Sequence, residues 1–264
     1  MRSRLEGKRV VVTRPDDQAR DLAALLEAAG AVPVRCPTIV IAPPASYAEV
    51  DAALARLGAH DWVVFTSANG VRSLLARADE REVDLRVELG EARVAAVGGT
   101  TSEVLTEHGV PVAFVPREAT AASLGATLPD VEGRSVLLAR GERADLALPR
   151  ALEGRGARVS AVTVYRTLPV APSGQGLEEL RLGADVITFT SPSTVEGFVS
   201  LGPEWRSLAR HAIVVTIGPT TTAAALAMGF GVHAEARDRS MSALVDAIAG
   251  VFAAVRYADK DFLR

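Results

Sequence analysis

Hydroxyl, glycine and arginine residues recur at one kind of place in this sequence, directly after short apolar runs. They occur six times: Arg14, Thr66 with Ser67, residues 98–101, Arg140, Thr190 with Ser191, and residues 218–221. Hydroxyls donate hydrogen bonds, helix N-termini present free backbone N–H groups, and arginine binds carboxylate or phosphate groups in a bidentate manner. The pattern indicates a binding site for an anionic ligand.

A structural explanation competes with this interpretation at each position. Serine or threonine after a strand is an ordinary N-cap of the following helix, and glycine can serve only to relieve a tight turn. Arg14 or Arg140 alone could be a surface charge. Capping does not predict six such turns at matching positions of the chain, so we expect these residues to line a cleft.

Tyr165 is a further candidate, because the chain has only three tyrosines. It lies in the stretch VYRTLPVAPS, which we place in a linker rather than in a core strand. A phenol there could donate a hydrogen bond or act as a general acid. A tyrosine that packs the hinge between two domains explains the same residue equally well.

Several kinds of site lack their motifs. No GxxxxGK[ST] is present, and GRGARV follows a predicted helix, so P-loop and Rossmann nucleotide sites are not expected. The histidines are scattered and Cys36 is the only cysteine, so we expect no metal site and no internal disulfide. Without a GxSxG elbow, Ser67 and Ser191 are expected to bind rather than to attack.

Charge and hydropathy exclude further classes of protein. A net charge of -3 and a pI near 5.9 provide no basic surface for sequence-independent nucleic-acid binding. The N-terminus, MRSRLEGKRVVVTRP, has no apolar stretch of signal-peptide length, and no run reaches the ~18 apolar residues of a membrane span. We therefore expect a cytoplasmic protein.

The two halves of the chain repeat one another. RVVVTR (9–14) matches SVLLAR (135–140), FTSANGV (65–71) matches FTSPSTV (189–195), and AAVGGTT (95–101) matches VTIGPTT (215–221). In each half, β-branched apolar runs alternate with polar turns and stretches of helical periodicity. Strands that are apolar on both faces predict parallel sheets covered on both sides, so we predict an α/β fold of two doubly wound domains that arose by duplication.

Two extended segments with prolines, 36–44 and 164–173, are interpreted as the links between these domains. The predicted organisation is a discontinuous first domain (1–37 and 170–264), a second domain (43–163), and linkers 38–42 and 164–169. The alternative is two tandem domains divided near residue 130, and the spacing alone does not decide between them.

Taken in order, VVVTRP, FTSANGV, AVGGTT, LLARG, VYRT, FTSPSTV and IGPTT resemble the uroporphyrinogen-III synthase family over about residues 10–248. The resemblance implies two flavodoxin-like domains joined by a two-stranded linker, and a lyase of tetrapyrrole (haem) biosynthesis. Its reaction cyclises hydroxymethylbilane to uroporphyrinogen III, with loss of water and inversion of ring D. It also implies a cofactor-free monomer that receives its substrate from the preceding deaminase.

The resemblance further implies roles for individual residues. Tyr165 matches the family's linker tyrosine, which is proposed to assist departure of the substrate hydroxyl. The predicted substrate-binding residues are Arg14, Thr66, Ser67, Asn69, Gly98, Thr101, Arg140, Thr190, Ser191, Ser193, Pro219, Thr220 and Thr221. Many members have proline and then a basic or polar residue after FTS, whereas this chain has Ala68-Asn69-Gly70, which leaves no charge at Asn69.

Two other functions fit parts of the pattern. A non-catalytic hinged binding protein for a small polyanionic ligand would also use two α/β domains, but it would not need a phenol in its hinge. A nucleotide-dependent transferase would need the phosphate-binding loops that this sequence lacks.

Overall fold

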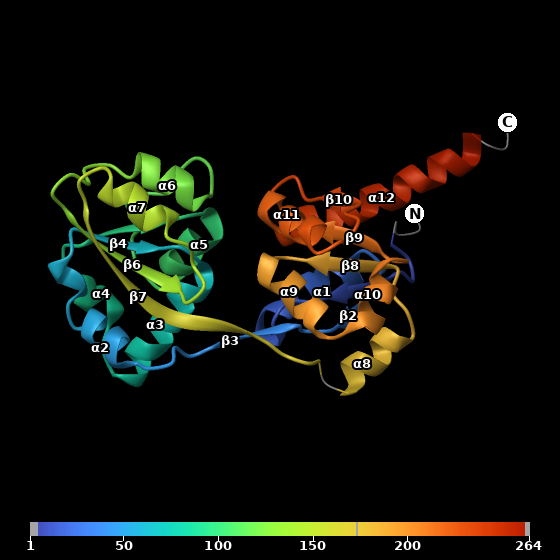
Figure 1. Cartoon of the computed structure of the whole chain (residues 1–264), viewed down its shortest axis with the longest axis horizontal. Helices are drawn as coiled ribbons and strands as arrows, with labels where there is room; N and C mark the ends of the chain where they lie inside the picture. Colours follow the sequence, from blue (N-terminus) through green and yellow to red (C-terminus); the bar gives the residue numbers. More distant parts are fainter. Residues whose placement is uncertain (1–4, 173, 262–264) are drawn as a thin grey trace. The chain divides into compact units, whose positions relative to one another are not determined.

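A computed structural model describes residues 5–172 and 174–261 of the chain. The polypeptide divides into two compact units: unit 1 comprises Met1–Val40 and Leu168–Arg264, and unit 2 comprises Ile41–Thr167. Each unit is built on parallel strands flanked by helices (Figure 1), which confirms the predicted α/β class. Within the described residues, no helix has both the length and the apolar character that a membrane crossing requires.

The sheet of unit 1 has five parallel strands in the order β10-β9-β8-β1-β2. They are β1 (Arg9–Val12), β2 (Val32–Arg35), β8 (Val186–Phe189), β9 (Ile213–Thr216) and β10 (Ala234–Glu235). Val11 of β1 pairs with Val34 of β2 on one side and with Ile187 of β8 on the other. If the five strands of unit 1 are numbered in chain order, the sheet order is 5-4-3-1-2, which is the flavodoxin-like doubly wound order.

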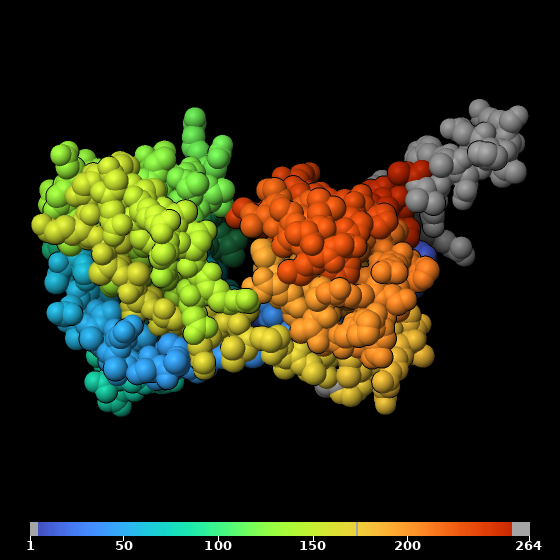
Figure 2. All heavy atoms as spheres, viewed as in Figure 1, coloured from blue at the N-terminus to red at the C-terminus, as the bar shows by residue number. Residues whose placement is uncertain are grey.

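The strands of unit 1 form from β-branched runs that are buried on both faces. Val10 and Val12 pack with helices α1 (Ala19–Ala28) and α12 (Met241–Asp261) on one face of the sheet. Val11 packs on the opposite face, with residues of α8 (Gly174–Arg181), α9 (Pro192–Ser200), α10 (Pro203–Ala209) and α11 (Pro219–Ala227). A short 3-10 turn, η1 (Asp16–Gln18), precedes α1. In the view of Figure 2, the visible surface of unit 1 comes mainly from its second segment, which begins at Leu168.

The sheet of unit 2 has the strand order β3-β7-β6-β4-β5, and strands β4 to β7 run parallel. The strands are β3 (Ile39–Ala42), β4 (Trp62–Phe65), β5 (Arg93–Ala96), β6 (Ser135–Gly141) and β7 (Arg158–Pro169). Its helices are α2 (Ala48–Leu54), η2 (Leu57–Ala59), α3 (Ala68–Glu80), α4 (Leu85–Leu89), α5 (Gly99–Glu107), α6 (Ala121–Thr127) and α7 (Ala147–Glu153). Val63 and Phe65 belong to one core, and Trp62 and Val64 to the other, so this sheet is also buried on both faces.

The two sheets have corresponding strand orders. In unit 1, β10 is the edge strand next to β9. In unit 2, the corresponding place next to β5 is taken by Phe114, which forms an isolated parallel bridge with Ala95. Strands β6, β7, β4 and β5 thereby take the places of β1, β2, β8 and β9. This correspondence supports the predicted duplication, which stays a prediction.

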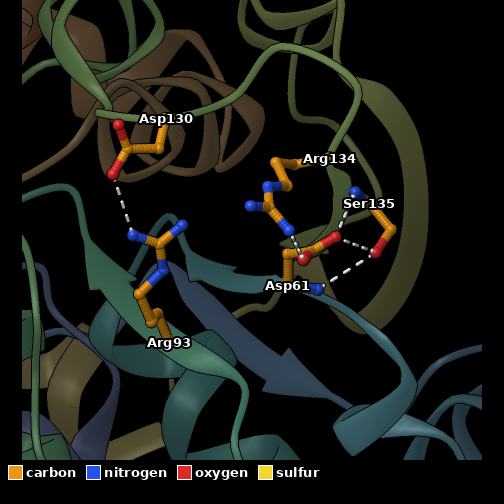
Figure 3. Close-up of polar contacts among 5 residues, drawn as sticks. All are labelled: Asp61, Arg93, Asp130, Arg134 and Ser135. Atoms are coloured by element: carbon orange, nitrogen blue, oxygen red, sulfur yellow. Dashed lines mark hydrogen bonds and ion pairs between the residues drawn. The ribbon is translucent and has the colours of Figure 1, made fainter.

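Asp61 holds the amino ends of two strands of unit 2 together. Its Oδ2 accepts hydrogen bonds from the backbone N–H and from the hydroxyl of Ser135, both at 2.8 Å (Figure 3). Its Oδ1 accepts from Arg134 at 2.9 Å. These hydrogen bonds, those of Ser135 foremost, lower the pKa of Asp61 from 3.8 to about 2.

Asp185 makes the corresponding contacts in unit 1. Its carboxylate accepts from the backbone N–H of Arg9 at 2.8 Å and from the ammonium of Lys8 at 2.9 Å. Both aspartates stand just before an apolar strand, at the opposite edge of the sheet from the polar turns. They fix the register of the strands that carry those turns.

The structure corrects the placement of Tyr165. The prolines of this segment predict a linker at Tyr165, but residues 164–169 are the second half of β7, and Tyr165 pairs with Gly141 of β6. Pro169 is the last residue of β7 and Pro172 follows it, so neither proline interrupts the strand. The prolines therefore end the strand and do not exclude it.

Candidate functional site

The predicted polar residues collect at the carboxyl edge of each sheet, because parallel strands of one sheet end on the same side. The unit 1 edge consists of Arg14 after β1, Thr190 and Ser191 after β8, and residues 218–221 after β9. The unit 2 edge consists of Thr66 and Ser67 after β4, residues 98–101 after β5, and Arg140 at the end of β6. The structure thus brings the predicted residues together as two sets, one in each unit.

Ser67 and Tyr165 meet at the unit 2 edge. Their hydroxyl oxygens lie 3.1 Å apart, and both side chains are partly exposed. Ser67 is also the N-cap of α3, because its Oγ accepts a hydrogen bond from the backbone N–H of Gly70 at 3.1 Å. The capping role and a site role therefore coexist in one hydroxyl.

Gly141 provides the space that the Tyr165 ring occupies. A Cβ atom at this position would lie 2.7 Å from Cζ of Tyr165 and 2.9 Å from its hydroxyl oxygen. The pairing of β6 with β7 shifts register between Arg140 and Gly141, at the point where the ring crosses the strand. Any side chain at residue 141 would displace the phenol.

Arg140 is engaged by its own unit. Its Nη1 donates to the carbonyl oxygens of Ala144 and Asp145, at 3.3 and 3.0 Å. Its Nε is buried and has no hydrogen-bond partner among the described residues. Arg140 therefore braces the loop that follows β6 while its guanidinium stays at the edge.

The threonines of the two glycine-containing turns differ in exposure. Thr101 and Thr221 are only 6% and 3% exposed, whereas their neighbours Thr100 and Thr220 are exposed. The backbone N–H groups of Thr101 and Thr221 donate to the carbonyl oxygens of Gly98 and Gly218 at 3.1 and 3.0 Å. The sequence pattern predicts Thr101 as the binding residue of its turn, whereas Thr100 is the exposed one, because sequence alone does not show which hydroxyl of a helical first turn faces outward.

In unit 1, Ser191 caps α9 in a reciprocal arrangement with Thr194. The Ser191 hydroxyl accepts from the Thr194 backbone N–H at 3.2 Å, and the Thr194 hydroxyl accepts from the Ser191 backbone N–H at 3.3 Å. Thr190 and Ser193 flank this cap and are partly exposed, and the exposed Pro219 is the first residue of α11. In unit 2, Asn69 lies in the first turn of α3 and is also partly exposed.

The arginines of the unit 1 edge include one that the sequence pattern does not indicate. Arg14 contacts the sulfur of Met241, at the start of α12. Arg239 lies beside Gly218, since a Cβ built on that glycine would be 3.8 Å from both Cγ and Nε of Arg239. Arg239 stands in the loop before α12 and follows no long apolar run, so the spacing that marked the other residues did not mark it.

The histidine and cysteine residues do not assemble into a site. Within residues 5–172 and 174–261, no cluster of three or more His, Cys, Asp or Glu side chains could hold a metal ion. Cys36 is fully buried in a core of unit 1, and this burial raises the pKa of its thiol to about 12. Such a thiol is poorly suited to act as a nucleophile.

A family model described as uroporphyrinogen-III synthase HemD matches residues 20–246. The chain belongs to the uroporphyrinogen-III synthase family. The uroporphyrinogen-III synthase of Synechococcus elongatus is 31% identical over 253 residues, which are 92% of this chain and 95% of the relative. That of Chlorobaculum parvum is 32% identical over 233 residues, 85% of this chain and 91% of the relative. The resemblance drawn from the ordered motifs is confirmed.

Solved structures of the family share the fold. A mutant uroporphyrinogen III synthase from the extremely thermophilic bacterium Thermus thermophilus superposes with a TM-score of 0.65 at 22% identity, covering 93% of this chain and 98% of that one. The enzyme of Helicobacter pylori gives a TM-score of 0.64 at 17% identity, with 93% and 99% covered. At these identities the likeness concerns the fold.

Proposed function

We propose that this chain catalyses the family's reaction, the cyclisation of hydroxymethylbilane to uroporphyrinogen III with loss of water and inversion of ring D. The family match over residues 20–246 carries the proposal. The relatives are named as synthases, so the alternative of a non-catalytic polyanion binder is not favoured. The reaction belongs to tetrapyrrole biosynthesis and is of the lyase class.

The composition of the two edges suits the proposed substrate. Hydroxymethylbilane carries eight carboxylates, and each can accept hydrogen bonds from hydroxyls, helix N-termini or guanidinium groups. Arg14 and Arg140 would supply charge. The hydroxyls and N-terminal turns would supply the remaining donors, from Thr66, Ser67, Asn69, Gly98, Thr190, Ser191, Ser193 and Thr220. Thr101, Thr221 and Pro219 belong to the same turns, but proline has no N–H and can offer only contacts of its ring. Since Thr101 and Thr221 are buried, we assign the outward contacts in their turns to Thr100 and Thr220.

Tyr165 is proposed as the acid of the first chemical step. Its phenol gives a proton to the hydroxyl of the hydroxymethyl group, so that water leaves and ring A becomes an electrophilic azafulvene. The substituted carbon of ring D then attacks to form a spiro intermediate, whose fragmentation and reclosure invert that ring. Because hydroxymethylbilane also closes spontaneously to the uninverted isomer, positioning of the two ends contributes more than strong acid-base catalysis.

Further features of the proposal concern the protein as a whole. We propose that it acts without a cofactor, as a cytoplasmic monomer that receives its substrate from the preceding deaminase. We also propose that the division into two units corresponds to the predicted domains, 1–37 with 170–264 and 43–163. Sedimentation analysis of the purified protein tests the monomer, and cell fractionation tests the location.

Isomer analysis tests the reaction itself. Hydroxymethylbilane is generated in place, the purified protein is added, and the products are oxidised and separated as uroporphyrins I and III. A dominant type III product is expected. Formation of type I alone, at the spontaneous rate, would overturn the proposal.

A further inference from the structure

Ser67 and Tyr165 are joined by one hydrogen bond between two hydroxyl groups, and each hydroxyl carries one proton. The oxygens lie 3.1 Å apart, and Ser67 Oγ accepts in addition from the Gly70 N–H at 3.1 Å. Only one of the two hydroxyl protons can lie between the oxygens. Apart from the Gly70 N–H, neither hydroxyl has another partner among the described residues. The pair therefore keeps one proton that it can offer to a ligand.

The position of Ser67 favours Tyr165 as the owner of that proton. Ser67 caps α3, a helix of 13 residues, and the N-terminus of a helix carries partial positive charge. A hydroxyl that accepts a hydrogen bond from a backbone N–H is polarised into a better donor. Ser67 then donates to the phenolic oxygen, and the proton of Tyr165 stays available.

The same arrangement stabilises Tyr165 after it has given up its proton. The phenolate oxygen would keep the hydrogen bond from Ser67, and a hydrogen bond to a charged oxygen is stronger than one to a neutral oxygen. Gly141 leaves room for the ring in this position, because a Cβ atom built on residue 141 would lie only 2.7 to 3.1 Å from atoms of the phenol. The oxygen that must accept the negative charge thus lies next to its donor before the reaction begins.

We propose that Ser67 is a positioning residue for proton transfer by Tyr165, linking the phenol to the N-terminus of α3. The inference rests on the proposed role of Tyr165 as the acid. It replaces the earlier assignment of Ser67 as a contact of the substrate carboxylates. Its function is to aim the phenol and to stabilise its ionised form.

The O–H bond of Tyr165 breaks and its proton forms a bond to the hydroxyl oxygen of the substrate. The C–O bond of that hydroxymethyl group then breaks, water leaves, and the electron pair of the ring nitrogen forms the azafulvenium double bond. Ring closure returns one proton from the substrate, so Tyr165 is reprotonated before the next turnover and no other reactant is consumed.

Kinetics of three variants test the proposal. Ser67→Ala removes the donor and is expected to lower kcat roughly 10- to 100-fold, as for a lost hydrogen bond to a charged group, with little change in KM. Ser67→Thr keeps the hydroxyl and the cap and is expected to restore most of the activity. Thr120→Ala is the matched control, because Thr120 caps α6 in the same unit with the same geometry and does not contact Tyr165. A higher KM with unchanged kcat in Ser67→Ala would assign the residue to substrate binding and overturn the proposal.

A second measurement needs no substrate. The protein is labelled with 13C at the phenolic carbon of tyrosine, and Tyr165→Phe identifies the Tyr165 signal. Ser67→Ala is expected to shift this signal, whereas Ser67→Thr and Thr120→Ala leave it in place. An unchanged signal in Ser67→Ala would overturn the coupling of the two hydroxyls. If the wild-type protein formed no type III isomer, the proposed function would fail, while the signal would still decide the coupling.

In the Tyr165→Phe background, Ser67→Ala is expected to have almost no further effect on kcat. Two residues that act through one hydrogen bond are not additive, whereas independent residues are. A full additional loss in the double variant would show that Ser67 acts without Tyr165 and would overturn the proposal.

Discussion

At the scale of single residues, the phenol of Tyr165 is the group on which the proposed chemistry depends. Tyr165→Phe is expected to lower kcat about 100-fold, at the lower end of what general acids contribute. The protein should lose no more than about 1 kcal/mol of unfolding free energy, since one hydrogen bond at a partly exposed site is removed. Turnover of hydroxymethylbilane and thermal unfolding measure the two effects. Tyr47→Phe, which keeps the ring that stacks with Arg77, serves as the control. Unchanged kinetics in Tyr165→Phe would remove this residue from the acid role.

Gly141 offers a separate test at the same scale. Gly141→Ala is expected to lower turnover by an amount similar to Tyr165→Phe, because the added methyl group would displace the phenol from its position beside Ser67. Gly133→Ala is a poor control because its φ is positive, whereas Gly250→Ala meets open space in α12 and lies outside both predicted edges. A crystal structure of Gly141→Ala with the ring unmoved would contradict this interpretation.

The exposed threonines are expected to contribute modestly and independently. Thr220→Ala or Thr100→Ala should each cost about 1 kcal/mol of substrate binding, typical of one hydrogen bond, and the double variant should show the sum. KM for hydroxymethylbilane measures the effect. Complete loss of activity from Thr220→Ala alone would contradict a site of many weak contacts.

At the scale of elements, α9 depends on a glycine that faces the chain leaving β2. A Cβ at Gly197 would lie 2.3 Å from the carbonyl oxygen of Thr38, too close for any side chain. Gly197→Ala is therefore expected to destabilise the protein by about 1 to 3 kcal/mol, the range of overpacked positions. Gly250→Ala is the matched control, because this residue of α12 meets open space and alanine favours helix. Denaturant unfolding of both variants decides the point.

Asp61, at the amino ends of β4 and β6, makes the stability of the protein depend on pH. The folded pKa of Asp61 is lowered to about 2, so its ionised form contributes stability above pH 4. That contribution is lost as the pH falls from about 4 to about 2, because the unfolded carboxyl group binds its proton first. Asp61→Asn should have a lower unfolding free energy at neutral pH, and that free energy should fall less steeply between pH 4 and pH 2 than in the wild-type protein. Asp130→Asn, which breaks an exposed ion pair with Arg93, should change little. Unfolding free energies measured between pH 2 and pH 7 distinguish the two variants.

Much of each element could be predicted from the sequence, because the patterns that define it are local. Runs such as VVV and VVF are apolar on both faces, as expected for a parallel sheet that is covered on both sides, and the polar turns follow where such strands end. Tyr165 was misplaced because nearby prolines resembled a linker, although they only terminate β7. Arg239 was missed, and Thr101 was chosen over Thr100, because exposure and loop packing depend on contacts far apart in the chain.

At the scale of the whole molecule, the sheets do not coincide with the sequence repeats. Each sheet combines strands from both halves of the sequence: β1 and β2 lie with β8, β9 and β10, and β4 and β5 lie with β6 and β7. Neither repeat therefore forms a sheet by itself. The alternative of two tandem domains divided near residue 130 does not agree with this pairing, since β4 and β6 are neighbours.

The discontinuity of unit 1 also governs the order in which the protein can fold while it is being synthesised. Val10 of β1 pairs with Val186 of β8, so β1 and its neighbour β2 leave the ribosome long before β8 exists. At ordinary rates of translation the wait is roughly ten to thirty seconds. During that interval the continuous segment 41–167 is complete and can fold, whereas the apolar strand β1 stays exposed to chaperones and to other nascent chains.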